Sequence, residues 1–222
     1  MRLQRRTRIK FCGLTSVAEI ALAVEAGADA IGVIVAESPR QVDVARLGEL
    51  AAAVPAFVAK VGVLAAQGQR ETAALRELGY MLQFSGDEPA ELCERLAAGR
   101  YLKAFHLAPG QKDDVLDDAS LAAYRNATWM FDSRVDARYG GTGVPFAWKL
   151  VEAAAAVRPV IVSGGLTPEN VAACVRSVRP YAVDVRSGIE TAGRKDPAKM
   201  LAFVQAVREA DEAPTAALSR NA

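Results

Sequence analysis

The feature that most constrains this chain is an alternation of short apolar runs with longer amphipathic segments, which continues along most of its 222 residues. The apolar runs predict strands over 8–13, 30–36, 60–65, 80–85, 100–106, 128–132, 159–163 and 181–186. The other segments predict helices over 16–26, 44–54, 71–78, 89–98, 113–124, 146–157, 168–178 and 197–209. The first helix also has clear end signals, because Ser16 and Glu19 have capping-box spacing and Gly27 follows the last turn.

Strict alternation of strands and helices predicts a parallel sheet, and near-continuous apolar strands are typical of sheets that are buried on both faces. Two architectures fit this pattern, an open doubly wound sheet and a closed eight-stranded barrel. Eight strand–helix pairs in a chain of this length favour the barrel. We therefore predict an α/β fold, a single-domain (β/α)8 TIM barrel over residues 1–210, followed by a small polar tail over 211–222 that is expected to be disordered.

Composition argues against several classes of partner. The formal net charge is +1, which gives no support for a nucleic-acid partner. No apolar run approaches the roughly 20 residues that span a bilayer, and no apolar signal segment follows the basic N-terminus. The three cysteines, Cys12, Cys93 and Cys174, fit neither a disulfide framework nor a zinc spacing. We expect a cytoplasmic protein, a monomer or homodimer, that acts on a small molecule with no metal, nucleic-acid or membrane partner.

In a barrel of this type the active site lies where the strands end and the βα-loops begin. Cys12 ends the first strand, two residues after Lys10, so both side chains are expected to face the barrel interior. A thiol there is either a small core residue or a nucleophile or general base that a cation such as Lys10 assists. Asp132 ends the sixth strand, where it is either a turn or N-cap residue or a general acid or base.

Other polar residues and glycines occupy the same end of the predicted barrel. Asp184 is expected to face the interior, either as a structural carboxylate or as a contact to a ligand hydroxyl. Arg40 is either solvated or binds a carboxylate or phosphate through its planar fork. His106 is the single histidine, and we interpret it as a structural or rim residue. Glycines in the last three loops form either tight turns or a phosphate site: Gly140, Gly141, Gly143, Gly164, Gly165 and Gly188.

An ordered series of motifs gives the chain a family resemblance. The motifs are KFCGLT at 10–15, GADAIG at 27–32, SPR at 38–40, Gln83 with GDE at 86–88, FD at 131–132, GGTG at 140–143, SGGL at 163–166, PENV at 168–171, VDV at 183–185, SGIE at 187–190 and KD at 195–196. In this order, and across almost the whole chain, the sequence resembles the phosphoribosylanthranilate isomerases of tryptophan biosynthesis.

The resemblance implies an aldose–ketose isomerase that needs no cofactor and carries out an Amadori rearrangement of N-(5′-phosphoribosyl)anthranilate. It implies that Asp132 is the general acid, that Cys12 is the base, and that Arg40 holds the anthranilate carboxylate. Gln83 and Asp184 are implied to contact the sugar or the bridging amine. The last loops are implied to hold the phosphate, through Gly143, Gly164, Gly165, Arg186, Ser187 and Gly188.

Among the departures from the pattern of the family, three bear on which substrate is bound. Ser85 stands where a histidine is usual, Ala65 lies where strand three usually ends in Val-Asn, and Arg186 replaces a small hydroxyl residue. These departures leave two other readings open. One is an isomerase of another phosphorylated aminoaldose, and the other is a non-catalytic barrel that binds a phosphorylated metabolite.

Overall fold

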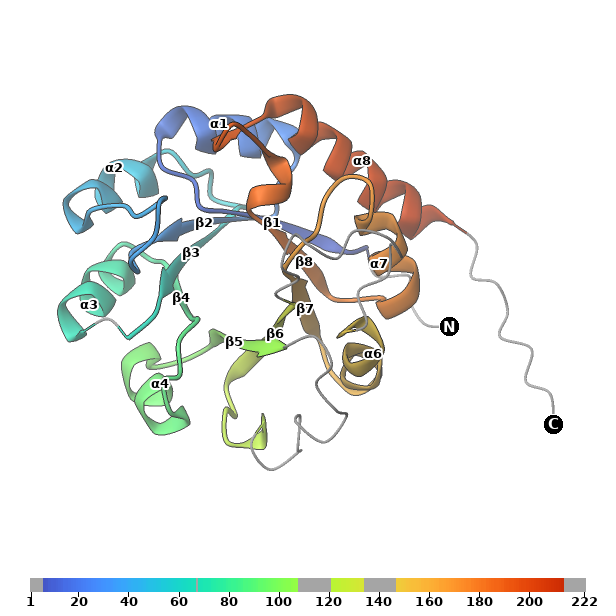
Figure 1. The fold of residues 1–222 in the computed structure, drawn as a ribbon. Helices are drawn as coiled ribbons and strands as arrows, with labels where there is room; N and C mark the ends of the chain where they lie inside the picture. Colours follow the sequence, from blue (N-terminus) through green and yellow to red (C-terminus); the bar gives the residue numbers. More distant parts are fainter. Residues whose placement is uncertain (1–5, 67, 108–120, 134–146, 214–222) are drawn as a thin grey trace.

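The computed structural model describes residues 6–66, 68–107, 121–133 and 147–213. Its eight long strands are parallel and form a closed barrel in chain order, and β1 pairs with both β2 and β8. Helices surround this ring on its outside (Figure 1). The predicted (β/α)8 barrel is therefore confirmed. None of the helices within the described residues is long and apolar enough to cross a membrane.

The strands lie within two residues of their predicted bounds at each end. They are β1 (Arg8–Cys12), β2 (Ala30–Ile34), β3 (Ala59–Leu64), β4 (Met81–Phe84), β5 (Tyr101–Leu107), β6 (Ala127–Ser133), β7 (Val160–Ser163) and β8 (Ala182–Val185). Side chains alternate along each strand, and those that point outward pack under the helices. Phe11 and Phe131 are outward-facing examples, and both belong to the main hydrophobic core.

The helices of the barrel are α1 (Val17–Ala26), α2 (Leu47–Ala52), α3 (Gln69–Glu77), α4 (Ala90–Ala97), α6 (Ala147–Val157), α7 (Val171–Val178) and α8 (Pro197–Glu212). The predicted caps of α1 are confirmed, because the Ser16 side chain accepts from the Glu19 amide and Gly27 adopts a φ of 102°. The helix predicted over 44–54 is divided instead. A 3-10 turn, η1 (Val44–Arg46), comes first because the Asp43 carboxylate caps the Ala45 amide at 2.8 Å.

Two further helix ends differ from the sequence prediction by three residues, and one predicted helix is largely outside the described residues. Helix α7 begins at Val171 rather than at 168, because Asn170 Oδ1 first accepts from the Thr167 amide at 2.9 Å. Helix α8 continues to Glu212, so the first two residues of the expected tail are helical. Asp211 holds that last turn by accepting from the amide and the hydroxyl of Thr7, at 2.6 and 2.7 Å. The helix predicted over 113–124 falls mostly outside the described residues, as do residues 214–222 of the tail.

The barrel interior is arranged in layers along its axis. An apolar cluster fills the lower part: Val61, Leu102, Ala104, Met130, Ile161 and Ala182. Above it lies a layer of buried polar side chains, Lys10, Gln83, Ser163 and Asp184. Packed interiors of this kind are typical of the fold, so ligands are confined to the end of the barrel where the strands finish.

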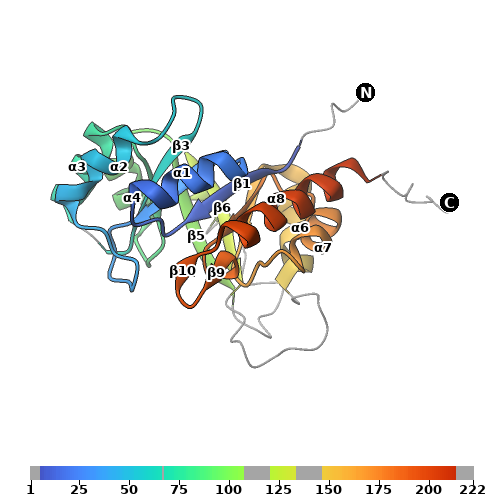
Figure 2. The same cartoon turned by 90° about the horizontal axis from the view of Figure 1, so that it is seen from above.

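A small hairpin that sequence patterns did not predict follows β8. A 3-10 turn, η3 (Ser187–Ile189), leads into the antiparallel strands β9 (Glu190–Thr191) and β10 (Arg194–Lys195). The hairpin lies beside the N-terminal end of α8, whereas β1 begins beside the C-terminal end of that helix (Figure 2). It therefore belongs to the same end of the barrel as the predicted site.

Candidate active site

The first part of the site surrounds the thiol of Cys12 at the end of β1. Below it, Lys10 Nζ donates to Asp184 Oδ1 at 2.7 Å, and Ser163 Oγ donates to Asp184 Oδ2 at 3.1 Å. The expectation that Lys10 and Cys12 both face the interior is confirmed, and Lys10 lies within hydrogen-bonding reach of the thiol. Asp184 is thus a hydrogen-bonded partner of Lys10 beneath Cys12.

Burial dominates the electrostatics of Cys12. It raises the pKa of the thiol, the positive charges of Lys10 and Lys195 lower it, and Asp184 raises it, so that the pKa ends above its ordinary value. Burial lowers the pKa of Lys10, but Asp184 and Cys12 together raise it by more, so Lys10 stays charged. The fixed ammonium is therefore available to stabilise a thiolate when one forms.

Gly32 of β2 makes room for this arrangement. It is the register partner of Cys12 on the neighbouring strand. A Cβ at Gly32 would lie 2.9 Å from Cys12 Sγ and 3.0 Å from Lys10 Nζ, both too close. The thiol and the ammonium lie against the backbone of β2, so a side chain at position 32 would displace them.

The second part of the site lies across the mouth, where β5 and β6 end. His106 and Asp132 are register partners on these strands, and their Nδ1 and Oδ2 atoms are 4.0 Å apart. His106 Nε2 lies 2.8 Å from the carbonyl oxygen of Ser85, which can only accept, so Nε2 is the donor. Of the two readings of His106, structural or rim residue, its place near the end of β5 and its partial exposure fit a rim residue. Its closeness to Asp132 was missed, although both residues end apolar strands that are consecutive in the sequence.

Arg40 lies in the loop after β2. Its guanidinium is hydrogen-bonded to Glu190, which follows β8, on the other side of β1. Arg40 Nε donates to Glu190 Oε1 at 3.2 Å, and Nη2 forms a second, short contact with Glu190 Oε2. Lys195 also donates to Glu190, at 2.9 Å, and to the carbonyl oxygens of Cys12 and Arg186, at 2.7 and 2.9 Å. Sequence reasoning assigned no function to Glu190 or Lys195, because the hairpin that carries them was not foreseen.

The glycine-rich loops after β7 and β8 pack closely together. A Cβ at Gly188 would lie 1.9 Å from the carbonyl oxygen of Leu166, so only glycine fits there. Gly164 and Gly165 have φ values of 86° and 62°, which glycine adopts without strain. The predicted site residue Gly143, with Gly140 and Gly141, lies outside the described residues.

Arg186 and Gln83 complete the set of predicted residues. The aliphatic stem of Arg186 lies over Gly13, directly after Cys12, and the residue is exposed. Gln83 donates through Nε2 to Ser85 Oγ at 3.0 Å, whereas its buried Oε1 has no hydrogen-bond partner. An unsatisfied buried acceptor is costly, and a ligand donor would relieve that cost.

Within the described residues, no group of three histidine, cysteine or acidic side chains is placed to hold a metal ion.

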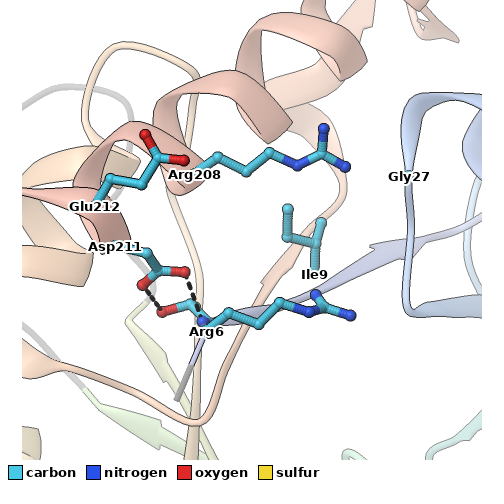
Figure 3. Close-up of a pocket in the computed structure, with 7 residues that line it drawn as sticks. Arg6, Ile9, Gly27, Arg208, Asp211 and Glu212 are labelled. Carbon is cyan, nitrogen blue, oxygen red and sulfur yellow. Dashed lines mark hydrogen bonds between the residues drawn. The ribbon is translucent and has the colours of Figure 1, made fainter. Parts of the chain in front are cut away.

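A pocket of about 420 Å³ lies at the opposite end of the barrel, between the start of β1 and the end of α8 (Figure 3). Arg6, Ile9, Gly27 and Arg208 are among its lining residues. It is therefore separate from the mouth that Cys12 and Asp132 share.

Comparison with known proteins decides the family. A family model described as N-(5′-phosphoribosyl)anthranilate (PRA) isomerase matches residues 9–206. The chain belongs to this isomerase family. Curated members include the N-(5′-phosphoribosyl)anthranilate isomerase of Moorella thermoacetica, which is 41% identical over 210 residues that cover 92% of this chain and 91% of the relative. The enzyme of Pseudomonas aeruginosa strain UCBPP-PA14 is 45% identical over 206 residues, which cover 90% of this chain and 95% of the relative.

Solved structures of the isomerase family have the same fold. The Thermotoga maritima isomerase superposes with a TM-score of 0.77 at 31% identity and covers 91% of this chain and 99% of its own. An isomerase in complex with reduced 1-(o-carboxyphenylamino)-1-deoxyribulose 5-phosphate superposes with a TM-score of 0.76 at 29% identity, with the same coverage.

Proposed function

We propose that this chain catalyses the Amadori rearrangement of N-(5′-phosphoribosyl)anthranilate to 1-(2-carboxyphenylamino)-1-deoxyribulose 5-phosphate in tryptophan biosynthesis, without a cofactor. Membership of the isomerase family supports this activity. The observation that carries the residue roles is the presence of a thiol and a carboxyl at the ends of β1 and β6, at one mouth of the barrel.

The acid acts first in this mechanism. Asp132 gives its proton to the ribose ring oxygen as the bond from that oxygen to C1′ breaks, and the bridging nitrogen forms a double bond to C1′. The bond electrons pass to the ring oxygen, so the product of this step is an open-chain protonated Schiff base. Partial exposure of Asp132 supports the role, because solvent is then able to return the proton after each turnover.

The base acts second. The Cys12 thiolate removes the proton from C2′, and the electrons of that bond neutralise the iminium as an enolamine forms. The enolamine then loses its C2′ hydroxyl proton and gains one at C1′, which gives the ketose. The net balance moves one proton from Asp132 to the substrate and one from the substrate to Cys12. Lys10 supports the thiolate form of Cys12 because its ammonium stays charged beside the thiol.

Substrate binding is divided between two groups of residues. Arg40 holds the anthranilate carboxylate through its planar fork, and the unsatisfied Gln83 Oε1 and the Asp184 carboxylate meet donors of the sugar or the bridging amine. The phosphate binds at the loops after β7 and β8, to the backbone amides of Gly164, Gly165, Ser187 and Gly188, with Gly143 from the loop after β6. Arg186 adds a charge-assisted contact at this position.

Oligomeric state and location are also part of the proposal. We expect a cytoplasmic enzyme that is a monomer or a homodimer. The three cysteines are free thiols, which is the usual state in a reducing compartment. A related T. maritima isomerase is described as dimeric. Light scattering on the purified protein would distinguish the two oligomeric states.

The test is turnover of freshly prepared N-(5′-phosphoribosyl)anthranilate by the purified chain. General acid–base groups contribute about 10²–10⁴-fold to rates, so Cys12→Ser and Asp132→Asn should each lower kcat/KM by a factor in that range. Cys174→Ala is the matched control, because Cys174 lies buried in α7 and away from the mouth. Absence of turnover by a folded wild-type protein would exclude the proposed activity.

A further inference from the structure

The Arg40–Glu190–Lys195 cluster connects three parts of the site that sequence reasoning treated separately. Arg40 comes from the loop after β2, whereas Glu190 and Lys195 face each other on the β9–β10 hairpin. Lys195 Nζ also donates hydrogen bonds to the backbone carbonyl oxygen of Cys12, the proposed base, and to that of Arg186, at the proposed phosphate loops. One buried carboxylate therefore links the arginine to the base and to the loop after β8.

The charges of the cluster favour an anionic ligand. Its three charged groups are two cations and one carboxylate, which leaves one positive charge without a counter-charge inside the cluster. Lys195 is 1% exposed and Glu190 is 5% exposed, but the Arg40 side chain is 24% exposed. Arg40 is therefore the member that a ligand is able to reach, and a bound carboxylate would balance the remaining charge.

The hydrogen bonds from Arg40 to Glu190 determine which edge of the guanidinium is left for a ligand. Glu190 takes the edge of the guanidinium that carries Nε and Nη2. The donors on Nη1 lie on the other edge of the same plane, so they remain suited to a second acceptor. Glu190 in turn is held by Lys195 and, through its backbone carbonyl, by Lys199 Nζ at 2.7 Å. The arginine is thus held in one orientation before a ligand arrives.

We propose that Glu190 is a positioning residue that orients Arg40 for the carboxylate of the substrate, and that Lys195 fixes Glu190 relative to the backbone of Cys12. This inference rests on the proposed function, because it takes the anthranilate carboxylate as the ligand of Arg40. An oriented receptor binds more tightly because less side-chain freedom is lost on binding. The Glu190 carboxylate is taken up by Arg40 and Lys195, so we expect its effect on substrate binding, through Arg40.

The experiment measures kcat and KM with N-(5′-phosphoribosyl)anthranilate for the wild type, Glu190→Gln, Arg40→Met and the double variant. We expect Glu190→Gln to raise KM by about tenfold and to change kcat less than threefold, which is the signature of lost binding that is equal in ground and transition states. In the Arg40→Met background the same substitution should change KM less than twofold, because Glu190 acts through Arg40. With the matched substrate that lacks the carboxylate, N-(5′-phosphoribosyl)aniline, Glu190→Gln should leave KM within twofold of the wild-type value.

The other outcomes overturn the inference. A lower KM in Glu190→Gln would show that Glu190 competes with the substrate for Arg40, and multiplying effects in the double variant would show that the two residues act independently. If Glu190→Gln fails to fold, Glu190→Asp serves instead, because it keeps the charge and withdraws it from Arg40 by one methylene; an unchanged KM there contradicts the inference. A wild-type protein without turnover overturns the proposed function together with this inference, whereas wild-type turnover with unaltered variant KM overturns the inference alone.

Discussion

The two sides of the barrel mouth differ in how the fold surrounds their proposed catalytic groups. On the β1–β3 side, Cys12 is buried in a small cluster with Ile34, Ala36 and Val63. On the β5–β6 side, the side chains of His106 and Asp132 are about one-third exposed, at 31% and 30%. The base is thus part of the packed interior, whereas the acid lies at the solvent boundary. Substitutions near the base should therefore affect stability and activity together, and substitutions near the acid should affect activity alone.

Lys10→Met should give the largest loss of stability. It leaves Asp184 buried without its cation, and breaking a buried ion pair from one side costs about 3–5 kcal/mol. Urea denaturation measures the change in the free energy of unfolding. The double variant Lys10→Met/Asp184→Leu should recover much of that loss, because no buried charge remains. A loss below about 1 kcal/mol in the single variant would contradict the described environment of the base.

Gly32→Ala should have an intermediate effect on the same side. The added Cβ meets both the Cys12 thiol and the Lys10 ammonium, and overpacking of this kind costs about 1–3 kcal/mol. Because the thiol must move, kcat should fall as well. Thermal unfolding and steady-state kinetics measure the two effects. Gly48→Ala is the matched control, since its nearest neighbour would be at 4.0 Å and its position in α2 favours alanine.

The pH dependence of Cys12 provides a third prediction. Burial raises its pKa above the ordinary 9.0, so the thiolate fraction and the rate of alkylation should still be increasing above pH 9. A folded-state pKa that is raised means that the native thiol holds its proton more tightly than the unfolded one. The stability from this group is therefore present below pH 9 and is lost as the pH rises further.

Site-resolved mass spectrometry after iodoacetamide treatment measures that pH dependence. Burial raises the pKa of Cys93 to about 11 and that of Cys174 to about 12, so these two thiols serve as internal references. Lys10→Met should move the Cys12 profile to higher pH, because it removes the nearest cation. A profile that stays in place would show that Lys10 does not influence the thiol.

The smallest effects on stability are expected at the acid. Asp132→Asn and His106→Asn should each change the free energy of unfolding by no more than about 0.5 kcal/mol, as partly exposed positions usually do. The activity of Asp132→Asn should nevertheless fall by the large factor expected for a general acid. Urea denaturation of both variants beside the wild type is the measurement. A loss of several kcal/mol in either variant would remove the contrast between the two sides.

Much of the fold followed from local patterns, because apolar runs and caps act within a few residues of one another. Cys12 and Asp132 became candidates because active sites of such barrels lie at strand ends. Glu190 and Lys195 did not, because a hairpin of two-residue strands has too few residues to produce a periodic signal. The ion pair between Lys10 and Asp184 joins residues that are 174 positions apart, on the first and the eighth strands, so no local pattern indicates it.

The sequence by itself determined the eight parallel strands, the end of the barrel at which we propose the active site, and the family of the chain. Alternating hydrophobicity, capping residues and short motifs are properties of neighbouring residues, so they can be recognised from the sequence alone. Only the tertiary structure decided which charges meet. Closure of the barrel brings β8 against β1, and it is this contact that places Asp184 under Lys10, and Glu190 and Lys195 between Arg40 and the base.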